Sequence, residues 1–239
     1  LSGGGRQHRP DVGHLPAGVL CQPAWRPAGA VRPVTSAAAG PPDGPELLET
    51  ALEVARAAAG LVRERALDEV AVASTKSSDT DVVTEVDRAA ERLIRRLLRE
   101  RRPDDAVHGE EGDDVAGSTG VRWVVDPIDG TVNFLYGIPQ YAVSVAAQVQ
   151  REGALEPTTV AGVVVDVAAG VEYAAVLRPD GAISATRDGR PLRVRGPARL
   201  AQRLVATGFG YDAGLRELQA RALVRLLPRV RDVRPFGSC

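Results

Sequence analysis

Cysteine is scarce in this sequence of 239 residues. Cys21 and Cys239 are the only two, and neither stands in a Cys-x-x-Cys or Cys/His cluster. Disulfide frameworks and zinc sites both need several closely spaced thiol or imidazole groups. We therefore expect neither of them, and a reducing cytoplasm is the compartment that fits best.

Long apolar runs and an excess of either charge are also missing. No run approaches the roughly 18–20 residues that a membrane-spanning helix requires, and the first ten residues lack the charged-then-apolar order of a secretory signal. The 30 Lys and Arg residues against 31 Asp and Glu residues give a formal net charge of −1, so the chain offers no overall basic surface. We expect a cytoplasmic protein with neither a membrane nor a nucleic acid as partner.

Apolar periodicity is absent from residues 1–44, which are rich in glycine and proline. Such a segment cannot bury enough apolar surface to offset the entropy lost on ordering. The sequence therefore predicts a disordered extension over residues 1–44. After it we expect an N-terminal α+β domain over residues 45–195 and the start of a C-terminal α/β domain over residues 196–239.

Two amphipathic helices open the ordered part of the chain. Apolar residues recur at helical spacing from Glu46 onward and again over residues 81–102, where Pro103 ends the pattern. Short apolar runs separated by turn residues then predict strands at 123–125, 141–149, 159–167, 171–177, 183–186, 192–194, 204–207 and 231–234, with a helix at 213–227. Helices first, then a meander of strands, indicate an α+β fold.

The strongest chemical signal is the hexapeptide that follows Trp123-Val124-Val125. Asp126-Pro127-Ile128-Asp129-Gly130-Thr131 places two carboxylates three positions apart at the end of an apolar strand. Hard divalent cations such as Mg²⁺ prefer oxygen ligands, including one or two carboxylates and backbone carbonyls. A polar Pro/Gly turn after a strand is the alternative interpretation of the same residues.

Two further acidic segments stand upstream of this hexapeptide. Glu110 and Glu111 lie between glycines, in what is equally well a solvated acidic loop. Thr84 and Asp87 have the spacing of a helix capping box, which by itself explains both residues. Neither segment is specific when taken alone.

Taken in order, these segments resemble the inositol monophosphatase family of magnesium-dependent, lithium-sensitive sugar phosphatases. The resemblance rests on Lys76-Ser77-Ser78-x-x-Asp81-x-Val83-Thr84-x-x-Asp87, on Gly109-Glu110-Glu111, and on residues 123–134 with the continuation Tyr136-Gly137-Ile138-Pro139-x-Tyr141. It covers about residues 46 to 239. It implies the alternating helix and sheet layers of the sugar-phosphatase fold, with the second layer incomplete here.

The resemblance also implies roles for individual residues. Glu110, Asp126, Asp129 and the Ile128 carbonyl match the family's magnesium ligands. Gly130 and Thr131, together with Asp129, match the residues that contact the substrate. Asp87 and Thr131 match the pair that polarises a metal-bound water, with Glu110 as a further catalytic group, while Lys76 and Asp81 match positions near a third ion.

One departure from the family pattern concerns the end of the sequence. Relatives continue beyond the position of Gly237-Ser238-Cys239 to a Trp-Asp-x-Ala-Ala-Gly-like motif whose aspartate ligates the second ion, and this motif is missing here. On this basis the chain is expected to bind its first magnesium ion better than its second and to turn over poorly. Apolar faces over residues 204–207 and 218–227 are expected to be uncovered.

The function implied is hydrolysis of a phosphate monoester, with inositol 1-phosphate as the foremost substrate and Mg²⁺ as cofactor. A 3′-phosphoadenosine nucleotidase, a fructose 1,6-bisphosphatase and a histidinol-phosphate phosphatase share the metal motif and stay open as alternatives. A truncated, non-catalytic protein that binds metal or acts by association is the alternative from another class. The partner expected is a small phosphorylated polyol, and family members are commonly homodimers.

Overall fold

The computed structural model describes residues 44–66, 72–75, 82–151 and 153–238. The disordered extension predicted for residues 1–44 lies outside the described residues except for Gly44, as do Lys76, Asp81 and Cys239. No helix within the described ranges is long and apolar enough to cross a membrane.

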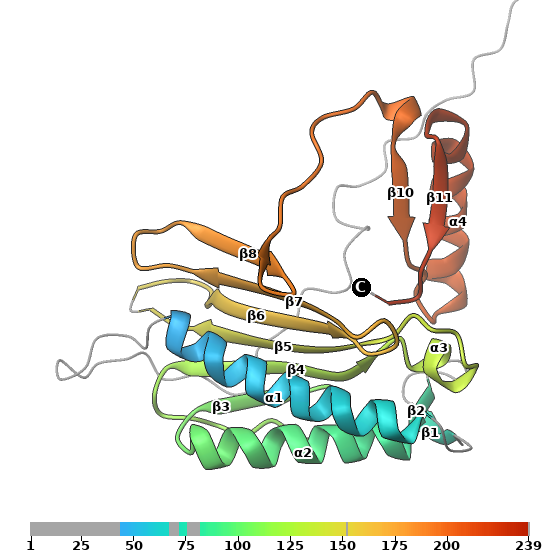
Figure 1. The fold of residues 1–239 in the computed structure, drawn as a ribbon. Coiled ribbons are helices and arrows are strands. Elements are labelled where there is room, and N and C mark those ends of the chain that lie inside the picture. The colour runs from blue at the N-terminus through green and yellow to red at the C-terminus, as the bar shows by residue number, and fades with distance from the viewer. Residues whose placement is uncertain (1–43, 67–71, 76–81, 152, 239) are drawn as a thin grey trace, which may run out of the picture. The chain divides into compact units, whose positions relative to one another are not determined.

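A seven-stranded sheet forms the centre of the described chain (Figure 1), with the strand order β3-β4-β5-β6-β7-β8-β9. The strands are β3 (Ala106–Gly109), β4 (Val121–Asp129), β5 (Ala142–Val149), β6 (Thr158–Asp166), β7 (Val171–Leu177), β8 (Ile183–Arg187) and β9 (Arg190–Pro191). From β4 onward every neighbouring pair is antiparallel. β3 pairs with β4 in parallel, which brings the ends of these two strands to the same edge.

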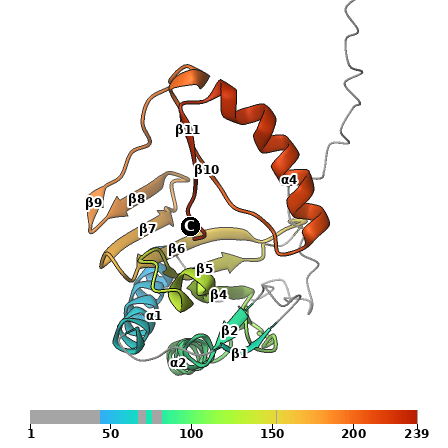
Figure 2. The same ribbon diagram turned by 90° about the vertical axis from the view of Figure 1, so that its right-hand side faces the viewer.

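Two long helices lie side by side below the sheet in Figure 1 and are seen nearly end-on in Figure 2. They are α1 (Gly44–Arg65) and α2 (Glu85–Arg101). α1 packs over β5, β6 and β7, and α2 packs against α1 and β4. Their buried apolar stripes meet the buried face of the sheet in one core, which includes Leu47, Val54, Ile94, Trp123, Val145 and Val163.

The remaining elements are smaller. β1 (Val72–Thr75) and β2 (Val82–Thr84) form an antiparallel pair just before α2. α3 (Thr131–Leu135) follows β4 directly. We call residues 200–238 the C-terminal segment; it contains η1 (Leu200–Gln202), β10 (Leu204–Thr207), α4 (Ala213–Leu226), η2 (Leu227–Arg229) and β11 (Asp232–Pro235), with β10 and β11 paired in parallel.

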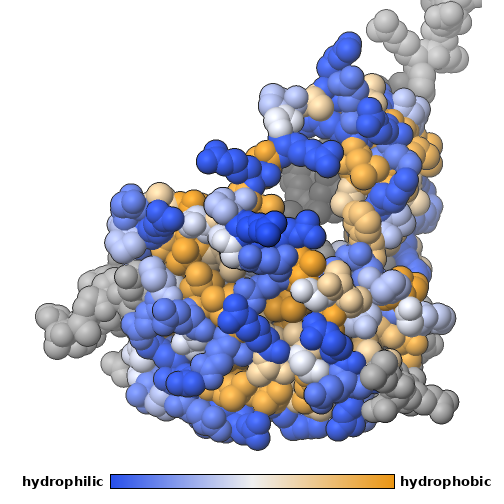
Figure 3. All heavy atoms as spheres, in the orientation of Figure 1, coloured by the Kyte–Doolittle hydropathy of each residue, from blue (hydrophilic) through white to orange (hydrophobic). Residues whose placement is uncertain are grey.

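The C-terminal segment exposes much of its apolar surface, as expected for residues 204–207 and 218–227. α4 contains no buried residue. Leu204 is 57% exposed, Val224 73% and Leu227 50%. Figure 3 shows apolar side chains at the surface over these elements, in the upper right of the view.

The structure confirms the α+β class and corrects several element boundaries. The second helix begins at Glu85 rather than at residue 81, because the residues just before it pair with β1. The strand expected at 123–125 extends over Val121–Asp129. The strand expected at 192–194 is instead Arg190–Pro191, since the turn at Asp188 (φ 49) and Gly189 (φ 72) reverses the chain at once.

Candidate active site

The Asp-Pro-Ile-Asp motif lies inside β4 rather than after it. Asp126 pairs with Ser144, and Asp129 pairs with Ala142. An advance of three residues along β4 is therefore matched by only two residues along β5. This is a bulge, and Pro127 suits it because proline has no N–H to donate to a ladder. The bulge delivers both aspartates, each half-buried, to the same end of the strand.

Gly130 turns the chain from β4 into α3. Its φ of 93° and ψ of 39° are in the left-handed region, which favours glycine. A Cβ at this position would also lie 2.9 Å from the Ser238 Cβ and 3.0 Å from the Gln140 carbonyl oxygen. Conformation and space both require glycine here, so contact with a substrate is not needed to explain it.

Thr131 joins the turn to the start of α2. Its Oγ1 lies 3.0 Å from Asp87 Oδ1 and 3.0 Å from the Ile128 carbonyl oxygen, so its single proton can be donated to either. Thr84 caps α2, its Oγ1 accepting from the Asp87 N–H, while the Asp87 carboxylate accepts from the Thr84 N–H. The predicted capping box and the predicted Asp87–Thr131 contact are both confirmed.

Burial raises the pKa of the Asp87 carboxyl above its ordinary value. Hydrogen bonds from Thr84 and Thr131 act in the opposite direction and favour the ionised form, but burial is the larger effect. A nearby bound cation would also favour ionisation. The charge of the Asp87 carboxyl therefore depends on the balance between burial, which favours the neutral form, and hydrogen bonds or a cation, which favour the ionised form.

Glu110 follows β3, and the register of the parallel pair places it beside β4. Gly109 is paired with Val125, so the next residues along the two strands are Glu110 and Asp126. The Glu110 side chain is exposed. Adjacent backbone positions thus bring a third carboxylate to the edge that carries the β4 aspartates.

The candidate ligands offer only carboxylate and carbonyl oxygens, which is the chemistry that Mg²⁺ requires. As the side chains lie, however, no group of three or more His, Cys, Asp and Glu residues within the described ranges is placed to hold a metal ion. Like charges disfavour close packing of three carboxylates unless a cation neutralises them. The donor set and its position on the sheet fit the ion, and convergence of Glu110, Asp126 and Asp129 stays a prediction.

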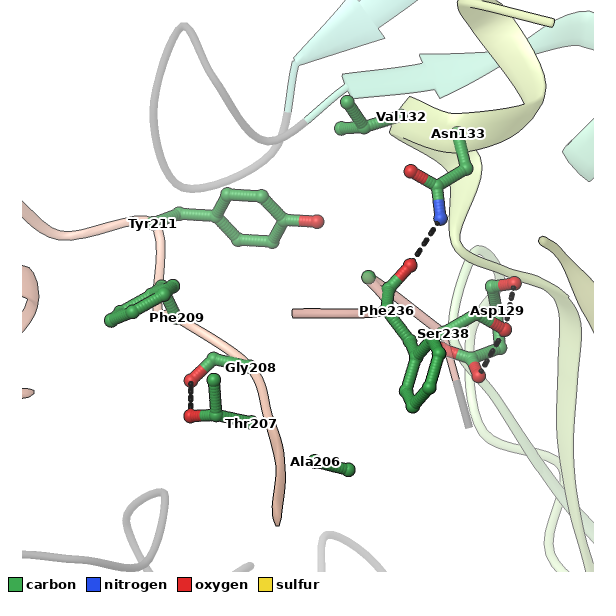
Figure 4. A pocket seen from close by; sticks show the side chains of 11 residues that line it. Asp129, Val132, Asn133, Ala206, Thr207, Gly208, Phe209, Tyr211, Phe236 and Ser238 are labelled. Atoms are coloured by element: carbon green, nitrogen blue, oxygen red, sulfur yellow. Dashed lines mark hydrogen bonds between the residues drawn. The ribbon is translucent and has the colours of Figure 1, made fainter. Parts of the chain in front are cut away.

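A cavity of about 540 Å³ opens beside Asp129. It is lined by Asp129, Val132 and Asn133 from the end of β4 and α3, and by Ala206, Thr207, Gly208, Phe209, Tyr211, Phe236, Gly237 and Ser238 from the C-terminal segment. Figure 4 shows the Tyr211 hydroxyl directed toward the space between the two groups.

Two side chains tie the C-terminal segment to this site. Ser238 Oγ lies 2.9 Å from Asp129 Oδ2 and 3.0 Å from the Asp129 carbonyl oxygen (Figure 4). Asn133 Nδ2 donates to the carbonyl oxygens of Gln140 and Phe236, each at 2.8 Å. The sequence did not reveal the role of Ser238, because a Gly-Ser pair is common in loops and its partner is 109 residues away.

Comparison with known proteins agrees with these observations. The profile of the inositol monophosphatase family matches residues 43–239. The chain is 48% identical to the inositol-1-monophosphatase SuhB of Mycobacterium tuberculosis over 179 residues, which are 73% of this chain and 60% of the relative. It is 40% identical to the Nus factor SuhB of Pseudomonas aeruginosa over 169 residues, 69% of this chain and 58% of that relative.

The fold is similar as well. A solved structure of M. tuberculosis SuhB has a TM-score of 0.64 and 42% identity, covering 82% of this chain and 71% of the other. The chain spans about 60% of the length of the mycobacterial relative. Since the family profile covers nearly all the described residues, the chain belongs to the inositol monophosphatase family.

Proposed function

We propose that this chain takes part in the magnesium-dependent hydrolysis of a phosphate monoester, most directly inositol 1-phosphate. The observation that carries the proposal is the convergence of β4, α2 and α3 on one edge of the sheet, where Thr131 meets both Asp87 and the Ile128 carbonyl. The 48% identical mycobacterial relative is named as an inositol-1-monophosphatase, which supports the same reaction.

In this proposal Glu110, Asp126, Asp129 and the Ile128 carbonyl hold magnesium. The ion supplies neutralisation of phosphate charge and activation of water, which phosphoryl transfer chiefly needs. The Ile128 carbonyl oxygen lies 3.0 Å from Thr131 Oγ1 and can accept its proton with one lone pair. The second lone pair of the carbonyl would then be available to a metal ion.

The Asp87–Thr131 pair has the geometry of a proton relay. Asp87 Oδ1 can hold the proton that Thr131 Oγ1 donates, which frees the threonine oxygen to accept a proton from a water that faces it. Rigid hydrogen bonds to Thr84 keep the carboxyl in place during the exchange.

The cavity beside Asp129 is the proposed place of the alcohol part of the substrate. Hydroxyl and amide groups of Ser238, Tyr211 and Asn133 line it together with the Asp129 carboxylate. Such groups can exchange hydrogen bonds with a polyol, and Phe209 and Phe236 give the cavity apolar walls. A small phosphorylated polyol therefore suits this cavity.

Association without catalysis is a second candidate function. The exposed apolar side chains of the C-terminal segment provide a surface for another protein. The P. aeruginosa relative is named a Nus factor rather than a phosphatase. The homodimer expected from the family resemblance would use such a surface too. Analytical ultracentrifugation of the full chain, which measures its oligomeric state, tests this expectation.

The deciding experiment is a phosphate-release panel with magnesium on inositol 1-phosphate, 3′-phosphoadenosine 5′-phosphate, fructose 1,6-bisphosphate and histidinol phosphate. We expect inositol 1-phosphate to be hydrolysed fastest and Asp126→Asn to abolish release. Glu217→Gln, on the exposed surface of α4, is the matched control and keeps the activity. Absence of release from every substrate, with magnesium bound, would favour the second candidate.

A further inference from the structure

The loop that carries Glu110, residues 109–112, is fastened to α2 by a buried ion pair. The Glu91 Oε2 atom accepts a hydrogen bond from the Glu111 N–H at 2.6 Å. The other oxygen, Glu91 Oε1, lies 2.6 Å from Arg95 Nε. The Glu91 side chain is 3% exposed and the Arg95 side chain 15% exposed, so water competes little for either contact.

The two glycines of the loop lie directly against this pair. A Cβ at Gly109 would stand 2.3 Å from Glu91 Oε1 and 2.6 Å from Arg95 Nη2. A Cβ at Gly112 would stand 2.8 Å from Glu91 Oε1 and 3.1 Å from Arg95 Nη2. The loop therefore lies in direct contact with the Glu91–Arg95 pair, and a side chain at either glycine would have to displace the ends of these two side chains.

The same helix also fixes the other half of the site. Asp87 is four residues before Glu91, about 6 Å along the helix axis, and it accepts from Thr131 at the start of α3. Residues four apart lie on one face of a helix. Asp87 therefore holds the β4–α3 end and Glu91 holds the Glu110 loop, with one rigid helical turn between them.

We propose that Glu91, oriented by Arg95, is a positioning residue that places the Glu110 carboxylate beside Asp126 for magnesium binding. The inference rests on the proposed magnesium site. Glu91 touches neither metal nor substrate and acts through the backbone of the loop. Groups that orient metal ligands in this way typically contribute 10–100-fold to metal affinity.

The test is calorimetric titration of the full chain with magnesium, together with hydrogen exchange at the Glu111 amide without metal. Glu91→Gln is expected to raise the magnesium Kd by about 10–100-fold and to speed exchange at Glu111. Glu100→Gln is the matched control: it removes the acid of an exposed i,i+4 pair with Arg96 on the same helix, and both readouts should stay unchanged.

Gly112→Ala is a second variant, whose added Cβ would meet the ends of the Glu91 and Arg95 side chains, so that their contact with the loop is disturbed. It should weaken magnesium binding too, and excess magnesium should restore turnover in both variants with the KM for substrate unchanged. A merely structural role would instead lower stability without this metal dependence. Unchanged magnesium affinity in Glu91→Gln and Gly112→Ala would overturn the positioning role of Glu91 and leave the proposed function standing. Failure of the unaltered chain to bind magnesium would overturn both the proposed function and this inference.

Discussion

The two ends of the described chain differ in how much they bury. In the N-terminal part, residues 44–177, α1, α2 and the sheet share a core of fully enclosed side chains. In the C-terminal segment α4 has no buried residue, and Val230, 9% exposed, is the most enclosed apolar side chain. The candidate site lies where they meet, with Asp129 and Asn133 on one side and Phe236 and Ser238 on the other.

This difference indicates a division of work. The N-terminal part supplies rigid positions for the proposed metal ligands, and the C-terminal segment supplies most of the cavity wall. Elements with few buried contacts open at low free-energy cost. The cavity wall is therefore expected to be the more mobile half of the site.

The largest contrast is expected from truncating one β-branched residue in each region. Ile94 in α2 is fully buried, whereas Val224 in α4 is 73% exposed. Ile94→Ala should lower the free energy of unfolding by about 2–5 kcal/mol, and Val224→Ala should change it by less than about 0.5 kcal/mol. Urea denaturation measures both, and equal losses would show that the C-terminal segment buries apolar surface after all.

The next contrast uses two acids that cap helices. Asp87→Asn should lower turnover by about 10²–10⁴-fold while costing only about 0.5–2 kcal/mol of stability. Asp212 accepts from the Leu215 N–H at the start of α4, so Asp212→Ala should cost similar stability with turnover preserved. Near-normal turnover in Asp87→Asn would refute the proton-relay role.

A smaller effect is expected where the two regions join. Ser238→Ala removes the hydroxyl that contacts Asp129 and should cost about 0.5–1.5 kcal/mol. Hydrogen exchange should then become faster over β11 and stay unchanged over β5, because β11 belongs to the less buried region. Equal acceleration in both strands would mean that the regions unfold as one unit.

The smallest effect concerns pH in metal-free solution. Burial raises the pKa of Asp87 in the folded state, so its stabilising contribution is present below the unfolded pKa of about 3.9 and is lost as pH rises through the folded value. Asp87→Asn removes this titration. Urea denaturation in the presence of EDTA should therefore show the variant gaining stability relative to the unaltered chain as pH rises, and a parallel pH dependence would contradict the shift.

Local signals in the sequence were enough for much of the fold. Strands 171–177 and 204–207 have the predicted bounds, and the capping box of Thr84 and Asp87 was found from spacing alone. These features depend on residues close in sequence. The sequence did not predict β3 or α3, because both are short. β3 depends on its pairing with β4, and α3 is a five-residue helix that begins just after β4 ends.

The site was only partly predictable for the same reason. The motif at β4 is contiguous and could be read directly, but Ser238 meets Asp129 across 109 residues. Asp87, Glu91 and Arg95 follow one another at four-residue steps along α2, but acid–base pairs at this spacing also stabilise exposed helix faces, and only the structure shows that Asp87 and Glu91 are buried. A buried polar row of this kind indicates a task other than packing.

Magnesium binding at the carboxyl end of β4, through Asp126 and its neighbours, is what the proposed function requires first. Calorimetric titration of the full chain with Mg²⁺, beside Asp126→Asn and the exposed control Glu217→Gln, tests it most directly. We expect saturable binding that Glu217→Gln retains and Asp126→Asn loses. Equal binding by Asp126→Asn and the unaltered chain would show that magnesium does not bind at this site.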